Sequence, residues 1–170
     1  KKLKKWLYIK TIYDNYLGYV KNTSFYKIFK PTHKVCVLKS IIYDSPYKKS
    51  SKIKKYLPFA SRIEKISENK DFLQFKKNGW IRKKDVKKNN FIEKNLIKTL
   101  KCFINVKYVW GGKTYNGIDC SALLQIFFQF NNKFVPRDTK DQVKFFKEKK
   151  SNKRFGMNDI IFWKGHVAIC

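Results

Sequence analysis

One cysteine and one histidine of this chain have the neighbours expected of a thiol nucleophile and its base. The cysteine ends the segment Tyr108-Val-Trp-Gly-Gly-Lys-Thr-Tyr-Asn-Gly-Ile-Asp-Cys120 and opens an apolar stretch of helical character. A thiol in the first turn of a helix ionises more readily, because the unpaired backbone N–H groups there carry partial positive charge. The histidine, His166, heads a short run of strand character, Val-Ala-Ile. A histidine can accept a thiol proton and later return it to a leaving amine, so the pair predicts nucleophilic catalysis.

Each of these residues also has a simpler interpretation. A lone cysteine at a helix start is usually a small buried residue, and a lone histidine is more often structural. The whole string around Cys120 is less expected by chance, because it combines a tight turn, the cap Asp119 and a nucleophile in working order. Residues 136–139, Pro-Arg-Asp-Thr, remain open: they are either a simple turn before a helix or a site for an ammonium group.

Three helices and two strands are expected to position this chemistry. Asp119 is predicted to cap a central, buried helix that runs to about Phe130. Capping-box patterns at Asn90/Glu93 and Thr139/Gln142 predict two further helices, over about 90–104 and 139–147. The strands are expected at 159–163 and 166–170.

The first half of the chain has β character. Residues 31–88 contain short β-branched and apolar runs at 34–42, 62–66 and 72–75, and several strands in so short a segment predict a small barrel. The pair Asn78-Gly79 predicts a two-residue hairpin turn. Upstream, Asp14-Asn15 predicts a turn followed by a short strand.

The composition narrows the function classes. The 170 residues carry a formal charge of +28, from 40 Lys+Arg against 12 Asp+Glu. Such a charge is compatible with a polyanion as partner, but the lysines are spread over every segment and AT-rich codon usage explains the balance better. The four cysteines and two histidines lack zinc spacing, and Cys36 and Cys102 are interpreted as buried thiols. No apolar run approaches the roughly 20 residues needed to span a bilayer.

These motifs resemble the NlpC-type family of bacterial cysteine peptidases, a papain-like group that cleaves cell-wall peptides. The likeness covers about residues 90–170 and rests on the following segments: Tyr108-x-Trp110-Gly-Gly, Gly117-x-Asp119-Cys120-Ser121, Pro136-Arg137-Asp138, Gln142, Asn158-Asp-Ile-Ile-Phe-Trp163 and Gly165-His166-Val.

The resemblance implies an α+β fold with three parts. Residues 1–30 would end a first bacterial SH3-like barrel, and 31–88 would form a second one. Residues 89–170 would form a papain-like cysteine peptidase domain, cut short at its C-terminus, with its central helix packed on an antiparallel sheet. A third catalytic polar residue is expected beyond residue 170, and an acidic pocket residue before residue 1.

The resemblance also implies roles for individual residues. Cys120 would be the nucleophile, His166 the base, and Tyr108 would lie by the oxyanion site with the backbone N–H of Cys120. Asp138 would bind the free α-amine of an N-terminal L-Ala. The full set of substrate-binding residues would be Asp138, Ser121, Trp110, Arg137, Thr139 and Tyr16, with Tyr16 closing the far end of the site. Neither a metal nor a cofactor is expected.

The function implied is hydrolysis of the bond between γ-D-glutamate and the diamino acid of murein peptides. The expected partner is that peptide, not nucleic acid, and membrane insertion is not expected. Recycling of murein peptides in the cytoplasm is favoured, with the cell envelope as the alternative. Three rival functions remain open: a wall-binding module with a remnant peptidase domain, a cationic binder of nucleic acid or membrane surfaces, and an amidase or acyl transferase on the same fold.

Overall fold

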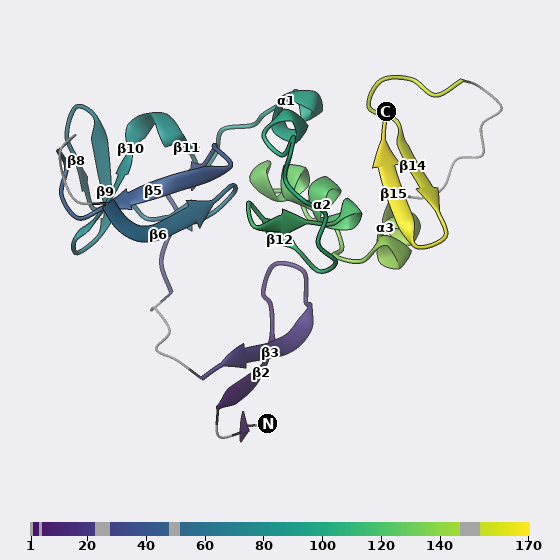
Figure 1. The fold of residues 1–170 in the computed structure, drawn as a ribbon, viewed down its shortest axis with the longest axis horizontal. Helices are drawn as coiled ribbons and strands as arrows, with labels where there is room; N and C mark the ends of the chain where they lie inside the picture. The colour runs from purple at the N-terminus through teal and green to yellow at the C-terminus, as the bar shows by residue number, and fades with distance from the viewer. Residues whose placement is uncertain (1, 4, 23–27, 48–51, 147–153) are drawn as a thin grey trace.

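The computed structural model describes residues 2–3, 5–22, 28–47, 52–146 and 154–170, and it shows a mixed fold of short helices and small antiparallel sheets. Figure 1 shows three groups along the chain: an N-terminal hairpin, a β-rich unit, and a part with helices that ends in a second hairpin. Apart from Tyr16, which lies in the N-terminal hairpin, the residues with predicted chemistry lie in the third group.

The N-terminal sheet has the order β1-β2-β3, formed by Lys2–Leu3, Trp6–Lys10 and Leu17–Lys21. Its turn spans residues 11–16 and is closed by a hydrogen bond from Thr11 N to Tyr16 O (2.9 Å). Asn15 adopts a φ of 55°, which asparagine tolerates better than most residues. The predicted turn and following strand are therefore confirmed; residues 23–27 of the predicted first barrel lie outside the described chain.

The β-rich unit contains two sheets, ordered β6-β5-β10-β9-β8 and β11-β4-β7. Its elements are β4 (His33–Val35), β5 (Lys39–Tyr43), β6 (Lys52–Pro58), β7 (Arg62–Ile63), β8 (Ser67–Glu68), β9 (Phe72–Lys76), β10 (Gly79–Arg82), the 3-10 turn η1 (Lys83–Asp85) and β11 (Val86–Lys88). Both sheets contribute to one apolar core, made of Val35, Ile63, Leu73, Ile81 and Val86. The unit therefore holds itself together through side chains shared by its sheets.

The apolar run at 34–42 forms parts of two strands, β4 and β5. One local prediction for this unit needs correction. The hairpin after β9 exists, but Gly79 already pairs with Lys76, so that Lys77 and Asn78 form its loop. Asn78 has a φ of 52°, in the left-handed region that asparagine tolerates better than most residues.

The remaining elements are α1 (Leu96–Lys101), β12 (Lys113–Thr114), β13 (Gly117–Ile118), α2 (Cys120–Phe130), α3 (Thr139–Phe146), β14 (Ile160–Trp163) and β15 (His166–Ile169). The predicted central helix is confirmed as α2, with Asp119 as its N-cap. The predicted final strands are confirmed as the β14–β15 hairpin, and β15 packs against α2.

The capping box predicted at Asn90 and Glu93 is wrong. Helix α1 starts at Leu96, and its N-cap is Asn95, whose side chain accepts a hydrogen bond from Lys98 N (2.9 Å). The backbone of Glu93 is engaged elsewhere: its N–H donates to Asn131 Oδ1 (2.7 Å) and its carbonyl accepts from Asn131 Nδ2 (3.0 Å). A contact with the end of α2 therefore keeps this segment out of the helix.

The capping box at Thr139 and Gln142 is also wrong, although α3 does begin at Thr139. The buried amide of Gln142 donates instead to the carbonyls of Ser121 and Pro136, both at 2.9 Å. Gln142 thus joins α3 to the first turn of α2. The expected end of this helix at residue 147 lies outside the described chain.

The second apolar core lies where the β-rich unit meets α2. Its buried members are Phe59, Ala60, Phe103, Ile118, Ala122, Ile126 and Phe130. The rings of Phe59, just after β6, and Phe130, at the end of α2, have centroids 4.7 Å apart. Burying a phenylalanine contributes roughly 1.5–3 kcal/mol, so this junction is a substantial source of stability.

A buried lysine reinforces the same junction. Lys34 in β4 is 1% exposed, and its Nζ donates to the carbonyls of Phe91 (2.6 Å) and Phe130. Nζ also lies 4.6 Å from the centroid of the Phe130 ring. Burial lowers the pKa of Lys34 to about 8. Because Phe130 is the last residue of α2, Lys34 places a cation at the negative end of the helix that begins with Cys120.

Candidate active site

The turn before Cys120 depends on glycine at two positions. Gly111 has a φ of 76°, in the left-handed region that favours glycine. Gly112 is enclosed by backbone: a Cβ there would lie 2.6 Å from the Gly117 carbonyl oxygen and 2.8 Å from that of Val109. The hairpin β12–β13 then returns the chain to Asp119 beside this turn. The close packing of these segments fixes where α2 begins.

Asp119 joins the turn to the helix. Its Oδ1 accepts from Ala122 N (2.8 Å), which is the N-cap interaction, and its Oδ2 accepts from Gly111 N (2.9 Å). Cys120 is consequently the first residue of α2. The sequence-based placement of the thiol in the first helical turn is confirmed.

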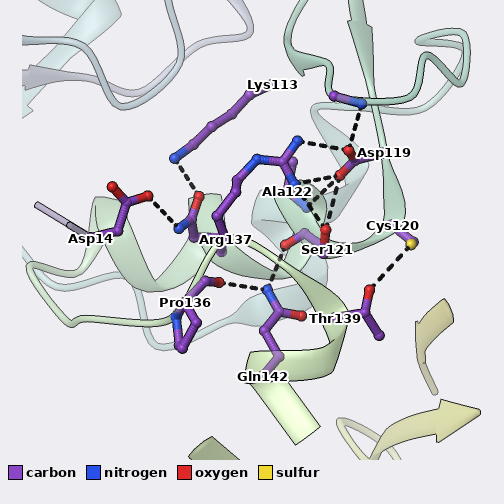
Figure 2. Close-up of polar contacts among 12 residues, drawn as sticks. Asp14, Lys113, Asp119, Cys120, Ser121, Ala122, Pro136, Arg137, Thr139 and Gln142 are labelled. Atoms are coloured by element: carbon purple, nitrogen blue, oxygen red, sulfur yellow. Dashed lines mark hydrogen bonds and ion pairs between the residues drawn. The ribbon is translucent and has the colours of Figure 1, made fainter. Parts of the chain in front are cut away.

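Arg137 completes this arrangement (Figure 2). Its Nη1 donates to Asp119 Oδ1 (3.0 Å) and its Nη2 to Asp119 Oδ2 (2.7 Å). Nη1 also donates to Ser121 Oγ (2.9 Å). Burial alone would raise the pKa of Asp119, but the bonds from Arg137 and Ala122 N lower it below its usual value. Asp119 therefore stays ionised and clamps three backbone segments together.

The Cys120 sulfur lies between two hydroxyl-bearing residues. Its Sγ is 4.0 Å from Oγ1 of Thr139, the first residue of α3. Tyr108 is 62% exposed. Its pKa is raised, mainly by its slight burial and then by the neighbouring Cys120 and Asp119. The phenol therefore lies beside the thiol, on the solvent side of the turn.

His166 is positioned by the β14–β15 hairpin. It pairs with Trp163 across the hairpin, and the two rings have centroids 4.7 Å apart. Gly165, with a φ of 76°, makes the tight turn between them possible. The described residues show no hydrogen bond between Cys120 and His166, so the role of His166 as base stays a prediction.

Four of the predicted substrate-binding residues are close to one another or to the thiol. Ser121 and Arg137 both donate to Asp119, with the Ser121 hydroxyl 3.2 Å from Oδ1. Asp138 stands between Arg137 and Thr139, the residue near the Cys120 sulfur. Burial alone would lower the pKa of Arg137. The hydrogen bonds and charge of Asp119, with smaller electrostatic effects of Asp138 and Tyr16, raise it instead. Trp110, in contrast, is 91% exposed and contacts none of the other predicted residues through a hydrogen bond or ring contact in the described chain. The substrate roles of all of them stay predictions.

Sequence reasoning missed a polar chain beside this cluster, whose two ends, Lys113 and Asp14, are labelled in Figure 2. Lys113 Nζ donates to Gln125 Oε1, and Gln125 Nε2 donates to Asp14 Oδ2 (3.1 Å). Gln125 is fully buried in α2. A glutamine inside the apolar run Ala-Leu-Leu-Gln-Ile-Phe was the available signal, because a buried amide requires polar partners.

The described part of the chain has neither a metal-binding cluster nor a membrane-spanning helix. Within it, no cluster of three or more His, Cys, Asp or Glu side chains has the arrangement of a metal site. None of its helices combines the length and the hydrophobicity needed to cross a membrane. The four cysteines are free thiols, and Cys36 and Cys102, expected to be buried, are half-buried against the junction core.

Comparison with known proteins finds similarity to proteins that are named as dipeptidyl-peptidases. A dipeptidyl-peptidase 6 from Lysinibacillus sphaericus is 33% identical over 75 residues, which are 44% of this chain and 28% of that protein. A gamma-D-glutamyl-L-lysine dipeptidyl-peptidase from Bacillus cereus is 26% identical over 132 residues, or 71% of this chain and 37% of that protein. The chain thus spans less than two fifths of these relatives.

A solved structure shares the fold. The crystal structure of an NlpC/P60 family protein from Bacillus cereus superimposes with a TM-score of 0.82 at 23% identity, covering 99% of this chain and 65% of that one. Residues 105–170, which include the cap, the thiol and the β14–β15 hairpin, match the model of the NlpC/P60 family. Over residues 105–170, this chain is therefore similar to the NlpC/P60 family.

Proposed function

We propose that this chain is part of a cysteine peptidase that acts on peptides derived from bacterial peptidoglycan. The observation that carries the proposal is the position of Cys120 at the first residue of α2, held there by the Asp119 cap and the Arg137 ion pair. A thiol at a helix N-terminus has the environment of a nucleophile. The NlpC/P60 match and the dipeptidyl-peptidase relatives support the same activity.

The proposed reaction proceeds in two stages. The Cys120 thiolate attacks the scissile carbonyl carbon, and the oxyanion that forms accepts hydrogen bonds from the Cys120 backbone N–H and the Tyr108 phenol. His166, having taken the thiol proton, gives it to the leaving amine as the C–N bond breaks. Water then attacks the resulting thioester, with His166 again as base, and this step releases the acid and restores the thiol.

The proposed substrate is a peptide with a free N-terminal L-Ala, cleaved between γ-D-glutamate and the diamino acid. Asp138 would bind the ammonium group, because a carboxylate beside the nucleophile can recognise a positive charge at a fixed distance from the scissile bond. Ser121, Thr139 and Tyr16 would help to shape this end of the site. Two features support this assignment: Asp138 directly precedes Thr139, whose Oγ1 lies 4.0 Å from the Cys120 sulfur, and the relatives include gamma-D-glutamyl-L-lysine dipeptidyl-peptidases.

The rest of the chain is proposed to frame the site. We assign residues 31–88 to a bacterial SH3-like barrel and residues 1–30 to the end of another. The two sheets that share one apolar core support the first assignment. The remainder, 89–170, would be the peptidase domain.

The test uses the full-length protein and the peptide L-Ala-γ-D-Glu-diamino acid, with mass spectrometry to detect released L-Ala-D-Glu. The wild type is expected to release it, and Cys120→Ala is expected to be inactive. Cys170→Ala is the matched control, because it removes an exposed thiol and should keep full activity.

Three results would count against the proposal in different ways. Cleavage by Cys120→Ala would overturn the nucleophile. Cleavage of N-acetylated peptides as fast as free ones would keep the peptidase but overturn recognition of the amine by Asp138. No cleavage by the wild type would favour the wall-binding module.

A further inference from the structure

The imidazole of His166 is in contact with the indole of Trp163. The two residues are paired across the β14–β15 hairpin, at the position that closes its turn. Their ring centroids are 4.7 Å apart, and the ring planes are inclined by 41°. Among the described residues, no other ring packs against this imidazole and no group forms a hydrogen bond with it. Trp163 is therefore the partner that the described chain provides for the predicted base.

The hairpin that carries this ring pair is itself fixed to the helices. Neighbouring residues of a strand point to opposite faces, and on the other face the Phe162 ring lies 6.1 Å from that of Phe146 in α3, centroid to centroid. The Phe146 ring in turn lies 5.5 Å from that of Phe128 in α2. Val167, which pairs with Phe162, is 4% exposed. The backbone of His166 is thus held relative to the helix of the nucleophile.

What the backbone does not fix is the orientation of the imidazole. The outer side-chain torsion of a histidine has broad minima, because it joins a tetrahedral carbon to a planar ring. Packing between two aromatic rings favours the packed arrangement over the separated one by a factor of about 2 to 10. The contact with Trp163 should therefore increase the fraction of molecules in which the His166 ring has one defined orientation.

The same contact suits the charge that the proposed reaction places on the imidazole. When His166 takes the Cys120 proton, the electron pair of the S–H bond stays on the sulfur and the imidazole becomes a cation. An aromatic ring within about 6 Å attracts a cation, and indole does so most strongly. Because Trp163 is 52% exposed, water weakens this attraction, and a modest effect is expected.

We propose that Trp163 is a positioning residue for His166, which holds the imidazole in one orientation and favours the imidazolium formed when Cys120 loses its proton. This inference rests on the proposed function, in which His166 is the base. Trp163 acts through the histidine. It adds to the proposed function a side chain outside the predicted catalytic and substrate-binding residues.

Proton NMR of the full-length protein tests the ring contact without any substrate. The variants His33→Gln and His166→Gln assign the imidazole C–H signals of both histidines, and His33, which lies in β4, serves as the reference. The indole ring current should displace the His166 signals in wild type. In Trp163→Ala these signals should move toward those of an unstructured peptide, while the His33 signals stay in place. Unmoved His166 signals would overturn the inference, whether or not a peptide is cleaved.

Alkylation of Cys120 by iodoacetamide, followed by mass spectrometry of the peptide that contains it, tests proton transfer without a substrate. His166→Ala should slow alkylation at pH 7, because the imidazole no longer takes the thiol proton. Trp163→Ala should slow it about 2- to 10-fold, and Trp163→Phe should restore most of the rate. In the double variant with His166→Ala, the loss of Trp163 should have no further effect. Additive losses there would overturn the inference.

Peptidase kinetics then separate the role of Trp163 from general stability. On L-Ala-γ-D-Glu-diamino acid, Trp163→Ala should lower kcat about 2- to 10-fold and leave KM nearly unchanged, because the indole acts on the base. Ile160→Ala is the matched control: it weakens the same hairpin on its other face, where Ile160 pairs with Ile169, and should keep the wild-type kcat and alkylation rate.

The failure of this inference can be told apart from the failure of the proposed function. Equal losses of kcat in Trp163→Ala and Ile160→Ala, or a higher KM with unchanged kcat in Trp163→Ala, would overturn the positioning role while Cys120-dependent cleavage stands. A wild type that cleaved no peptide would overturn the proposed function. The NMR and alkylation results would then still show whether Trp163 orients His166 toward the chemistry of the thiol.

Discussion

Arg137 and Asp119 form a two-bonded ion pair, with N–O distances of 3.0 and 2.7 Å, directly beneath the first turn of α2. The side chains are 11% and 6% exposed. The aspartate caps the helix, and the arginine comes from the segment before α3. The orientation of the nucleophile is thus linked to the segment that carries Asp138.

Replacing Arg137 should destabilise the protein and impair the site. Arg137→Met leaves a buried carboxylate without its cation, which typically costs about 3–5 kcal/mol. Arg137→Lys keeps the charge but loses the paired geometry, so a smaller loss is expected. Urea unfolding at pH 7 measures both. Arg62→Met, which removes a single bond to Asn132 Oδ1 (3.1 Å), is the control, and an equal loss there would contradict the special role of the pair.

The same pair predicts a pH dependence. The pKa of Asp119 is lowered from its usual 3.8, so its stabilising contribution is fully present above that value and disappears as the pH falls through the lower, folded-state pKa. The difference in unfolding free energy between wild type and Asp119→Asn should therefore be constant from pH 7 to 5 and shrink below about pH 4. A difference that stays constant down to pH 2 would mean that Asp119 is not held ionised.

Gly112→Ala should distort the turn before the thiol. The added Cβ would meet two backbone carbonyl oxygens, at 2.6 and 2.8 Å, that belong to closely packed segments. We expect a loss of about 1–3 kcal/mol in unfolding free energy, as for other overpacked sites, and slower alkylation of Cys120 by iodoacetamide. Gly18→Ala is the matched control, because nothing lies within 4 Å of a Cβ there. Equal effects of both substitutions would contradict the steric argument.

Lys34 predicts a second pH dependence, of the same sign but at alkaline pH. Its pKa is lowered from 10.5 to about 8 by burial, so the folded protein holds fewer protons than the unfolded one between these values, and stability rises with pH there. Relative to Lys34→Met, the wild type should gain stability from pH 8 to 10.5. The neutral amine still donates hydrogen bonds to the carbonyls at the end of α2. Guanidinium unfolding at several pH values measures this gain. If the difference in unfolding free energy between wild type and Lys34→Met did not change with pH, burial would not disfavour the charged form of Lys34.

Local signals predicted the parts of the site that are close in sequence. Asp119, Cys120 and the following apolar run specify a cap and a helix with little outside help, and the structure contains both. The β14–β15 hairpin follows from its apolar strands and Gly165 in the same way.

The predictions that were wrong, or missing, involve partners distant in sequence. Glu93 and Gln142 fit capping boxes by spacing. In the structure, however, the Glu93 backbone bonds to Asn131, and the Gln142 side chain bonds to the carbonyls of Ser121 and Pro136. The Asp14–Gln125 bond spans 111 positions. Spacing rules describe neighbours on one helix or strand, so they contain no information about such contacts.

Helix α2 contacts a different region of the chain at its start, its middle and its end. Arg137 holds its first turn, Gln125 joins its middle to the N-terminal turn, and Lys34 of the β-rich unit binds its last carbonyl. Loss of this one helix would remove partners from all three regions at once. The chain should therefore melt as one cooperative unit, with fluorescence and far-UV circular dichroism reporting the same midpoint, and its parts should not be separable as independently stable pieces.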